Sequence, residues 1–324
     1  MKKVLGFGNA LVDIMLPNSK EQLLNELGLG KGSMTLIDDE TLVKIDHLTS
    51  TLYQTKATGG SAANTINGLS KLGIETGFIG KVGKDEIGTF FETDLVNNKV
   101  KSHLLKSNTP AGRAFAFVTS DSERTFATYL GASIEMRPED LDKSWFTDYD
   151  YLYVEGYLVQ DHKLIETGMK LAKEAGLKIV LDLASYNVVE ANKDFLASLI
   201  TNYVDIVFAN EEEALSFTSL APEAALNELA EKTEIAVVKT GAKGSLIAQN
   251  KTTTKVDPIK VNPIDTTGAG DLYAAGFLFG LIHGYKPADC GKVASVLSGN
   301  VIEVLGAKMD EKRWEAIKET LSLS

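Results

Sequence analysis

Short apolar runs alternate with segments of helical periodicity along most of the chain. A compact apolar run predicts a buried strand, and apolar residues that recur every three or four positions predict a helix. The expected strands are residues 4–7, 33–37, 76–82, 151–154, 179–183, 206–208 and 235–238. The expected helices are residues 19–29, 61–72, 86–97, 164–175, 188–200 and 224–231, followed by a mostly helical C-terminal part from Gly268.

Strands that alternate with helices favour right-handed βαβ units. We therefore predict an α/β fold, a doubly wound and mainly parallel sheet with helices on both faces. Two strand-like runs, 113–119 and 125–130, are joined by Ser120-Asp121-Ser122-Glu123 and predict an antiparallel hairpin. The expected division is an α/β nucleotide- and substrate-binding core of residues 1–13, 56–108 and 133–324, with a small β-rich lid of residues 14–55 and 109–132.

Composition narrows the class of protein. The chain has 324 residues, 44% hydrophobic and 24% charged, which is typical of a globular protein with one large core or two domains. Its formal net charge of −11 argues against a nucleic-acid partner. No run approaches the roughly 18 apolar residues that a membrane helix needs. The single cysteine, Cys290, excludes an intrachain disulfide and fits the reducing cytoplasm, where we expect the protein to act.

The most informative stretch is Asp265-Thr266-Thr267-Gly268-Ala269-Gly270-Asp271, which runs into an apolar helical pattern. Small residues let a ligand approach the backbone, and the start of a helix presents free amides and a positive dipole to an anion. Asp271 would then take a proton from an attacking hydroxyl while the neighbouring amides hold a transferring phosphate. The plain alternative is a loop with a helix cap.

This stretch resembles the second signature of the PfkB, or ribokinase-like, carbohydrate kinases. Four other segments resemble motifs of the same family and follow in the family's order. They are Gly59-Gly60-Ser61-Ala62-Ala63-Asn64, residues 80–88, Asn210-Glu211-Glu212-Glu213 and Gly241-Ala242-Lys243-Gly244. Together these matches span nearly the whole chain.

The resemblance implies a ribokinase-like fold, ATP and Mg²⁺ as cofactors, and a role for each matching residue. Asp271 would be the catalytic base, and the amides of Gly268, Ala269 and Gly270 would form the anion hole. Asn210 and Glu213 would position Mg²⁺ through water. The residues implied near the nucleotide are Asn210, Lys239, Gly241, Gly244 and Asn300.

Two positions of the phosphate end stay open. Many members of the family carry threonine or serine where this chain has Lys239, so Lys239 either reaches a phosphate or is a solvated strand end. Asp265 and Thr267 lie where some members bind a monovalent cation such as K⁺.

The acceptor would bind near the first strand. Asp13 follows that strand, and a carboxylate there is costly unless something pairs with it. Asp13 could accept hydrogen bonds from two neighbouring sugar hydroxyls, with further contacts from Asn9, Asn64 and the Gly59-Gly60 pair; otherwise it is a turn residue. A dinucleotide fingerprint is excluded because Leu11 replaces its third glycine, and a Walker A loop is absent.

Residues 8–14, 123–132 and 210–214 are similar to the adenosine kinases within the family. By that resemblance Arg124, on the lid hairpin, would move onto the transferring phosphate, a task that suits a planar guanidinium. The plain alternative is a solvated hairpin residue. Leu130, Ala132 and Leu36 would wall an apolar slot for a base.

These observations predict an ATP-dependent kinase that phosphorylates a primary hydroxyl of a nucleoside, adenosine to AMP. The alternative is a kinase of a sugar or sugar acid, such as ribose, fructose or 2-keto-3-deoxygluconate. A catalytically silent regulator on the same scaffold would be expected to have lost Asp271 or the glycines beside it, which this chain keeps. We expect small-molecule partners, no nucleic acid, no membrane, and a monomer or homodimer.

Overall fold

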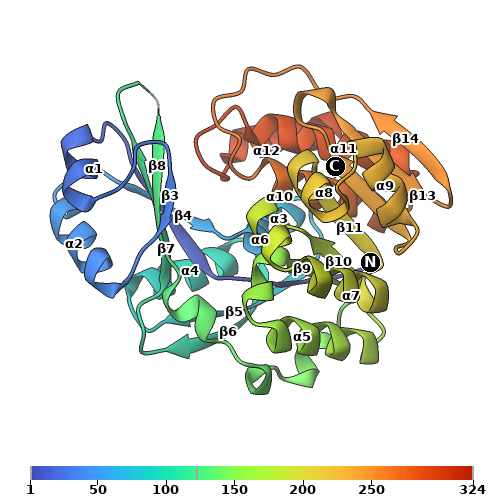
Figure 1. The fold of residues 1–324 in the computed structure, drawn as a ribbon, viewed down its shortest axis with the longest axis horizontal. Coiled ribbons are helices and arrows are strands. Elements are labelled where there is room, and N and C mark those ends of the chain that lie inside the picture. The colour runs from blue at the N-terminus through green and yellow to red at the C-terminus, as the bar shows by residue number, and fades with distance from the viewer. Residues whose placement is uncertain (1, 122, 323–324) are drawn as a thin grey trace.

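The computed structural model describes residues 2–121 and 123–322 and places the strands in two sheets (Figure 1). The large sheet has nine strands in the order β14-β13-β12-β11-β10-β9-β1-β5-β6. From β12 to β6 all neighbouring pairs are parallel, while β13 and β14 are antiparallel. The predicted α/β fold is confirmed.

The strands of the large sheet are β1 (Val4–Phe7), β5 (Thr76–Gly83), β6 (Val100–Ser107), β9 (Tyr151–Glu155), β10 (Lys178–Asp182), β11 (Ile206–Asn210), β12 (Ile235–Lys239), β13 (Ser245–Gln249) and β14 (Thr252–Val256). Its helices are α3 (Ser61–Lys71), α4 (Glu86–Asn97), α5 (His162–Glu174), α6 (Tyr186–Ala191), α7 (Lys193–Tyr203), α8 (Glu211–Thr218), α9 (Pro222–Ala230), α10 (Ala269–Ile282), α11 (Pro287–Val301) and α12 (Glu311–Thr320).

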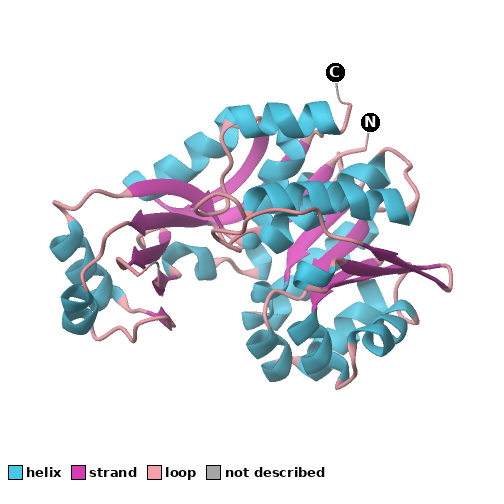
Figure 2. Ribbon diagram, turned by 90° about the horizontal axis from the view of Figure 1, so that it is seen from above, coloured by secondary structure: helices cyan, strands magenta, loops and turns pink. Residues whose placement is uncertain are grey.

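Both faces of the large sheet are buried, because successive side chains of a strand point to opposite faces. Tyr151 and Tyr153 of β9 join a core cluster with residues of α3, α10 and α11. Leu152 and Val154, between and beside them, join a second cluster with residues of α5 and α7. Figure 2 shows helices on both sides of this sheet. The strands therefore appear in the sequence as continuous apolar runs.

The second sheet forms the part of the molecule that we call the lid. Its five strands, in the order β3-β8-β7-β2-β4, lie apart from the large sheet, with two helices at their outer end (Figures 1 and 2). The elements are β2 (Leu11–Leu16), α1 (Glu21–Leu27), β3 (Met34–Leu36), α2 (Asp39–Thr49), β4 (Thr55–Gly59), β7 (Gly112–Val118) and β8 (Arg124–Tyr129).

The predicted hairpin is present, since β7 and β8 pair in antiparallel register with Phe117 opposite Thr125. Ser122, which the sequence prediction included in this hairpin, lies outside the described residues. Asp13 lies inside β2, opposite Ala57 of β4. The interpretation of Asp13 as a turn residue is therefore wrong, because Asp13 is the third residue of a strand that pairs with both β4 and β7.

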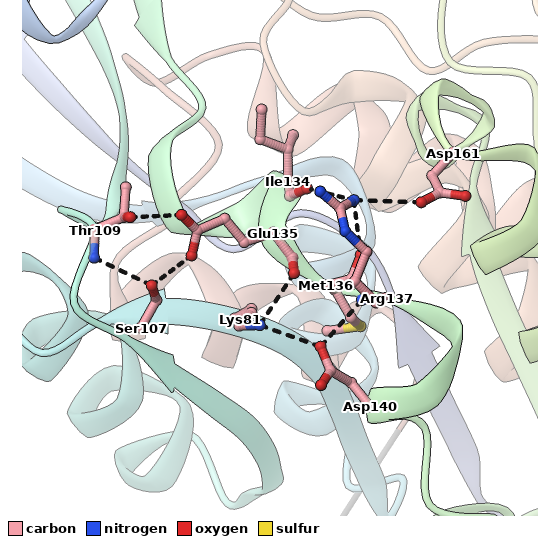
Figure 3. A network of polar contacts seen from close by, with 9 residues as sticks. All are labelled: Lys81, Ser107, Thr109, Ile134, Glu135, Met136, Arg137, Asp140 and Asp161. Atoms are coloured by element: carbon pink, nitrogen blue, oxygen red, sulfur yellow. Dashed lines mark hydrogen bonds and ion pairs between the residues drawn. The ribbon is translucent and has the colours of Figure 1, made fainter.

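The two ends of the hairpin segment are attached to the large sheet by one polar network (Figure 3). Ser107 and Thr109, where the chain leaves β6, donate their hydroxyls to the Glu135 carboxylate at the end of the 3₁₀ turn η1 (Gly131–Glu135). Lys81 of β5 donates to the Glu135 carbonyl at 3.0 Å and pairs with Asp140 at 3.1 Å. The chain is thus fixed on both sides of the β7–β8 hairpin.

One predicted helix is interrupted. Residues 188–200 were expected to form a single helix, but α6 ends and α7 begins at Asn192, which has φ −128° and ψ 21°. The Asn192 side chain donates to the Val188 carbonyl at 2.9 Å, so a local side-chain bond competes with the helical pattern. Within the described residues, no helix is both long and apolar enough to cross a membrane.

Candidate active site

The N-terminus of α10 forms one wall of the site. Its N-cap is Gly268, which has φ +76°, a left-handed conformation that glycine adopts without strain. A Cβ on Gly268 would also lie 2.6 Å from the Ala307 side chain. The first-turn amides of a helix have no carbonyl partner within it and can hold an anion. One of them, the Ala269 amide, donates to the Thr266 carbonyl at 3.1 Å, so an anion would compete with that bond.

Two residues of α3 hold the Asp271 carboxylate. Ser61 donates to one of its oxygens at 2.7 Å, and Asn64 donates to the other at 2.9 Å. Thr65 donates to the Asp271 carbonyl at 3.1 Å. Loss of hydration raises the pKa of Asp271 to about 6, while the bonds from Ser61 and Asn64 lower it. The carboxylate is therefore mostly ionised at neutral pH and oriented as a proton acceptor.

The Asp13 carboxylate lies beside the di-glycine segment. Burial, and then the negative charges of Asp271 and Asp265, raise the pKa of Asp13 to about 7. A Cβ on Gly59 would lie 2.3 Å from an Asp13 oxygen, and Gly60, at φ +90°, passes so close to Asn9 that its Cβ would lie 2.3 Å from the Asn9 carbonyl. Only glycines allow residues 59 and 60 to approach Asp13 and Asn9 this closely.

Asp13 opens into a cavity of about 260 Å³ between the lid and the loop that precedes α12. The cavity is lined by Asp13, Met15, Pro17, Tyr53, Thr55, Ala57, Leu305, Gly306, Ala307 and Lys308. Its walls are mostly apolar. Lys308 pairs with Asp94, so its charge is already compensated.

Sequence reasoning missed Glu155, which connects the acceptor side to α3. Its side chain is buried and accepts hydrogen bonds from the backbone and side-chain amides of Asn9, both at 2.8 Å, and from the Ala62 amide at 2.9 Å. Burial raises the pKa of Glu155 to about 7, although these hydrogen bonds lower it. The sequence pattern that could have identified Glu155 is an acidic residue directly after a buried apolar run. The same pattern singled out Asp13. The predicted contact of Asn9 with the acceptor stays a prediction, since its amide group points to Glu155.

Asn210 and Glu213 form a closed capping box at the start of α8. Asn210 accepts from the Glu213 amide at 2.8 Å, and Glu213 accepts from both the backbone and the side chain of Asn210. Burial raises the pKa of Glu213 to about 7, partly offset by the charge of Lys239. Within the described residues there is no cluster of three His, Cys, Asp or Glu side chains that could hold a metal. The role of this pair in positioning Mg²⁺ stays a prediction. An Mg²⁺ ion that arrives with ATP keeps several waters and needs few protein ligands.

Lys239 is not a solvated strand end. Its side chain is 14% exposed and donates to Asp182 at 2.8 Å. Sequence reasoning did not single out Asp182, which ends β10.

Gly241 and Gly244 follow β12 as predicted, with Gly241 facing open space. The Asn300 side chain bonds to the Val296 carbonyl and to Arg313, and its contact with a nucleotide stays a prediction.

Arg124 joins the lid to the core. Its guanidinium pairs with Asp265 and donates to the Ile264 carbonyl at 3.2 Å, so it is not a solvated residue. Asp265 also accepts from the amides of Thr267 and Gly306. A K⁺ ion does not fit the Asp265 carboxylate in the observed arrangement, because the Arg124 guanidinium already pairs with it.

The predicted apolar slot for a base is not confirmed for Leu130 or Ala132. Leu130 is partly buried, whereas Ala132 is completely buried, so the expectation that Ala132 walls a ligand slot is wrong.

The site combines a carboxylate held at the start of α10 with a second carboxylate, Asp13, near enough for their charges to interact. On a sheet of this topology, this arrangement is typical of kinases that phosphorylate small alcohols. The family model described as pfkB family carbohydrate kinase matches residues 34–313. The chain belongs to this family, whose members transfer a phosphoryl group from ATP to an alcohol.

Solved structures and curated relatives point to different acceptors. A probable sugar kinase from Rhizobium etli is 34% identical with a TM-score of 0.87, covering 100% of this chain and 99% of that one. The adenosine kinase from Sinorhizobium meliloti is 33% identical with a TM-score of 0.86, covering 98% and 99%. The 5-dehydro-2-deoxygluconokinase from Geobacillus thermodenitrificans is 28% identical over 84% of this chain and 85% of its own length.

Proposed function

We propose that this kinase phosphorylates the 5′-hydroxyl of a purine nucleoside, adenosine to AMP. The observation that carries the proposal is the cavity beside Asp13, which combines one carboxylate with mostly apolar walls. A carboxylate can accept two hydrogen bonds from the neighbouring ribose hydroxyls. Met15, Tyr53 and Leu305 would then contact the base. Tyr53 and Leu305 are 74% and 51% exposed, apolar surface that a bound base would cover.

The second candidate is a sugar acid, which the names of the curated relatives favour. A sugar acid carries its own carboxylate and needs a cation that is not already paired. In the described part of the cavity the cation is Lys308, which Asp94 neutralises, and Asp13 would repel a second carboxylate. These charges favour the neutral nucleoside.

The chain's own residues account for the chemistry. Asp271 accepts the proton of the attacking hydroxyl, and the amides at residues 268–270 hold the oxygens of the transferring phosphate. Bound with ATP near Asn210 and Glu213, Mg²⁺ would neutralise phosphate charge. Arg124 would release Asp265 and pair with the phosphate. A closed lid would exclude water, which otherwise competes as an acceptor.

A coupled assay of ADP release tests the acceptor. Adenosine, ribose, fructose, 2-keto-3-deoxygluconate and 5-dehydro-2-deoxygluconate are compared with ATP and Mg²⁺. Contact of a base with the apolar wall is worth roughly 2 kcal/mol, so we expect adenosine to exceed each sugar roughly 10–100-fold in kcat/KM. A sugar acid with the highest kcat/KM would overturn the nucleoside assignment. Asp271→Asn should lower turnover about 10²–10⁴-fold with any acceptor.

A pair of lid variants tests the cavity itself. Tyr53→Ala removes an aromatic ring from the cavity wall and should raise the KM for adenosine about tenfold. Val43→Ala is the matched control, since Val43 is 68% exposed on α2 and does not line the cavity. Equal KM values for the two variants would show that the base binds elsewhere.

A further inference from the structure

We infer that Lys239 is a further phosphate-binding residue of this kinase, whose ammonium group, oriented by Asp182, contacts the transferring phosphate beside Gly270. The inference rests on phosphoryl transfer at Asp271 but not on the identity of the acceptor. It assigns a role to a largely buried cation that the mechanism proposed above does not use.

Parallel strands bring the groups together. In the large sheet β10, β11 and β12 are neighbours, so Asp182, Asn210 and Lys239, the last residues of these strands, lie at the same edge. Lys239 is directly opposite Asn210 in the strand register. This is the edge where ligands bind in open α/β sheets.

The Lys239 ammonium lies against the anion loop. A Cβ on Gly270 would be 3.1 Å from the Lys239 Nζ and would meet no other side chain within 4 Å. The ammonium is therefore adjacent to the backbone whose amides are expected to hold the phosphate. A glycine at position 270 leaves the space between them open.

Asp182 fixes the direction of the ammonium and leaves hydrogen-bond donors free. The Lys239–Asp182 bond of 2.8 Å uses one of the three N–H groups of the ammonium. The Asp182 side chain is 5% exposed, so the pair is removed from bulk water, where its contact with an anion is strong. Burial lowers the pKa of Lys239, but Asp182 and Glu213 raise it to about 12, and the residue stays an ammonium at working pH.

The proposed step balances without a proton from Lys239. The acceptor oxygen forms a bond to the γ-phosphorus, its proton passes to Asp271, and the bond to the bridging oxygen breaks with its electron pair leaving on ADP. Lys239 donates a hydrogen bond to a non-bridging oxygen and keeps its proton. It thus stabilises charge that the anion-loop amides also stabilise.

Lys239 could instead serve only to neutralise the buried Asp182 carboxylate. A comparison of three variants separates this structural role from phosphate binding. Lys239→Met removes the cation, Lys239→Arg keeps it, and the double variant Asp182→Asn with Lys239→Met removes both charges. Urea unfolding and steady-state kinetics are measured for each, with the acceptor that gives the highest turnover in the wild-type protein. This choice keeps the result independent of the nucleoside proposal.

We expect Lys239→Met to lower kcat about 10²–10³-fold, the range for loss of one transition-state donor, with little change in the KM of the acceptor. The double variant should regain stability, because no uncompensated carboxylate is left, but should not regain turnover. Lys239→Arg should recover part of the turnover. A double variant that regains both stability and wild-type turnover would reduce Lys239 to a structural partner of Asp182 and overturn the inference.

Nucleotide binding gives a second readout that needs no turnover. In a thermal-shift titration without acceptor, a non-hydrolysable ATP analogue should stabilise the wild-type protein more than it stabilises Lys239→Met, while ADP, which lacks the γ-phosphate, should stabilise both equally. Equal stabilisation of both proteins by the ATP analogue would contradict a contact between Lys239 and the phosphate chain.

Discussion

At the scale of single residues, the charge state of Asp271 should govern the rate of the reaction. The pKa of Asp271 is raised to about 6, and the carboxylate accepts a proton only when ionised. We expect kcat, measured with both substrates saturating, to fall about tenfold per pH unit below pH 6. An unperturbed aspartate would keep the rate constant down to about pH 4, and a profile of that kind would argue against Asp271 as the base.

The di-glycine segment gives a second prediction at this scale. A methyl group on Gly59 would overlap the Asp13 carboxylate, so Gly59→Ala should displace Asp13 and raise the KM of the acceptor at least tenfold. Gly30→Ala is the control in the same lid, since its Cβ would meet only the Ser33 side chain, at 3.3 Å. The prediction fails if both variants keep the wild-type KM.

Sequence reasoning at this scale found the residues whose type is unusual in its place. Asp271 and Asp13 were found because a carboxylate beside glycines or after an apolar strand is costly without a function. Ser61, Thr65 and Asp182 were missed, because serine, threonine and aspartate are common near helix and strand ends and no local pattern distinguishes a ligand-holding one. Their partners are between 57 and 210 positions away in the chain.

At the scale of elements, the contact between α10 and α11 depends on small residues. A Cβ on Gly276 would lie 2.7 Å from the Ala294 Cα, which belongs to the backbone of α11 and cannot rotate away. Gly276→Ala should therefore destabilise the protein by about 1–3 kcal/mol, more than the helix propensity of alanine returns. Urea unfolding measures this change, and a variant as stable as the wild type would show that the helices can separate at little cost.

Most of the elements that were predicted have both faces buried, as in the central parallel strands, or a clear helical stripe. The strand β3 was predicted from alternation, although it is mostly exposed. The elements that were missed carry mixed patterns. In β14 only Val256 is fully buried, and β6, at the edge of the sheet, mixes polar and apolar residues without alternation. The strand β4 is short and rich in small or polar residues, while β2 is apolar except for Asp13. Both are identified through their pairing with each other and, for β2, with β7.

At the scale of the whole molecule, the buried carboxylates should make stability depend on pH. The pKa values of Glu155 and Glu213 are raised to about 7, above the value near 4 that a glutamate has in an unfolded chain. A raised folded-state pKa contributes stability that is complete below pH 4 and lost as the pH rises through 7. We expect the free energy of unfolding to fall between pH 5 and pH 7, by up to about 1.4 kcal/mol per pH unit for each group.

Glu155→Gln isolates one of these contributions. This variant cannot titrate at position 155, so its unfolding free energy should depend less steeply on pH over the same interval than that of the wild type. The comparison uses the slopes, because the lost hydrogen bond to Ala62 or Asn9 lowers stability by a constant amount at every pH. Equal slopes would mean that Glu155 is already ionised, without penalty, at pH 5.

The sequence by itself determined the parallel α/β core, the helix that begins at Gly268 and the family to which the chain belongs. These depend on periodicity and on small residues at fixed spacing, which are local properties of the chain. Only the tertiary structure decided that Asp271 is held by α3, that Lys239 is buried against Asp182 and that Arg124 reaches Asp265. Each of these contacts joins residues that are distant in sequence, and the side chains involved carry charge whose cost or benefit depends on which partner the fold places beside it.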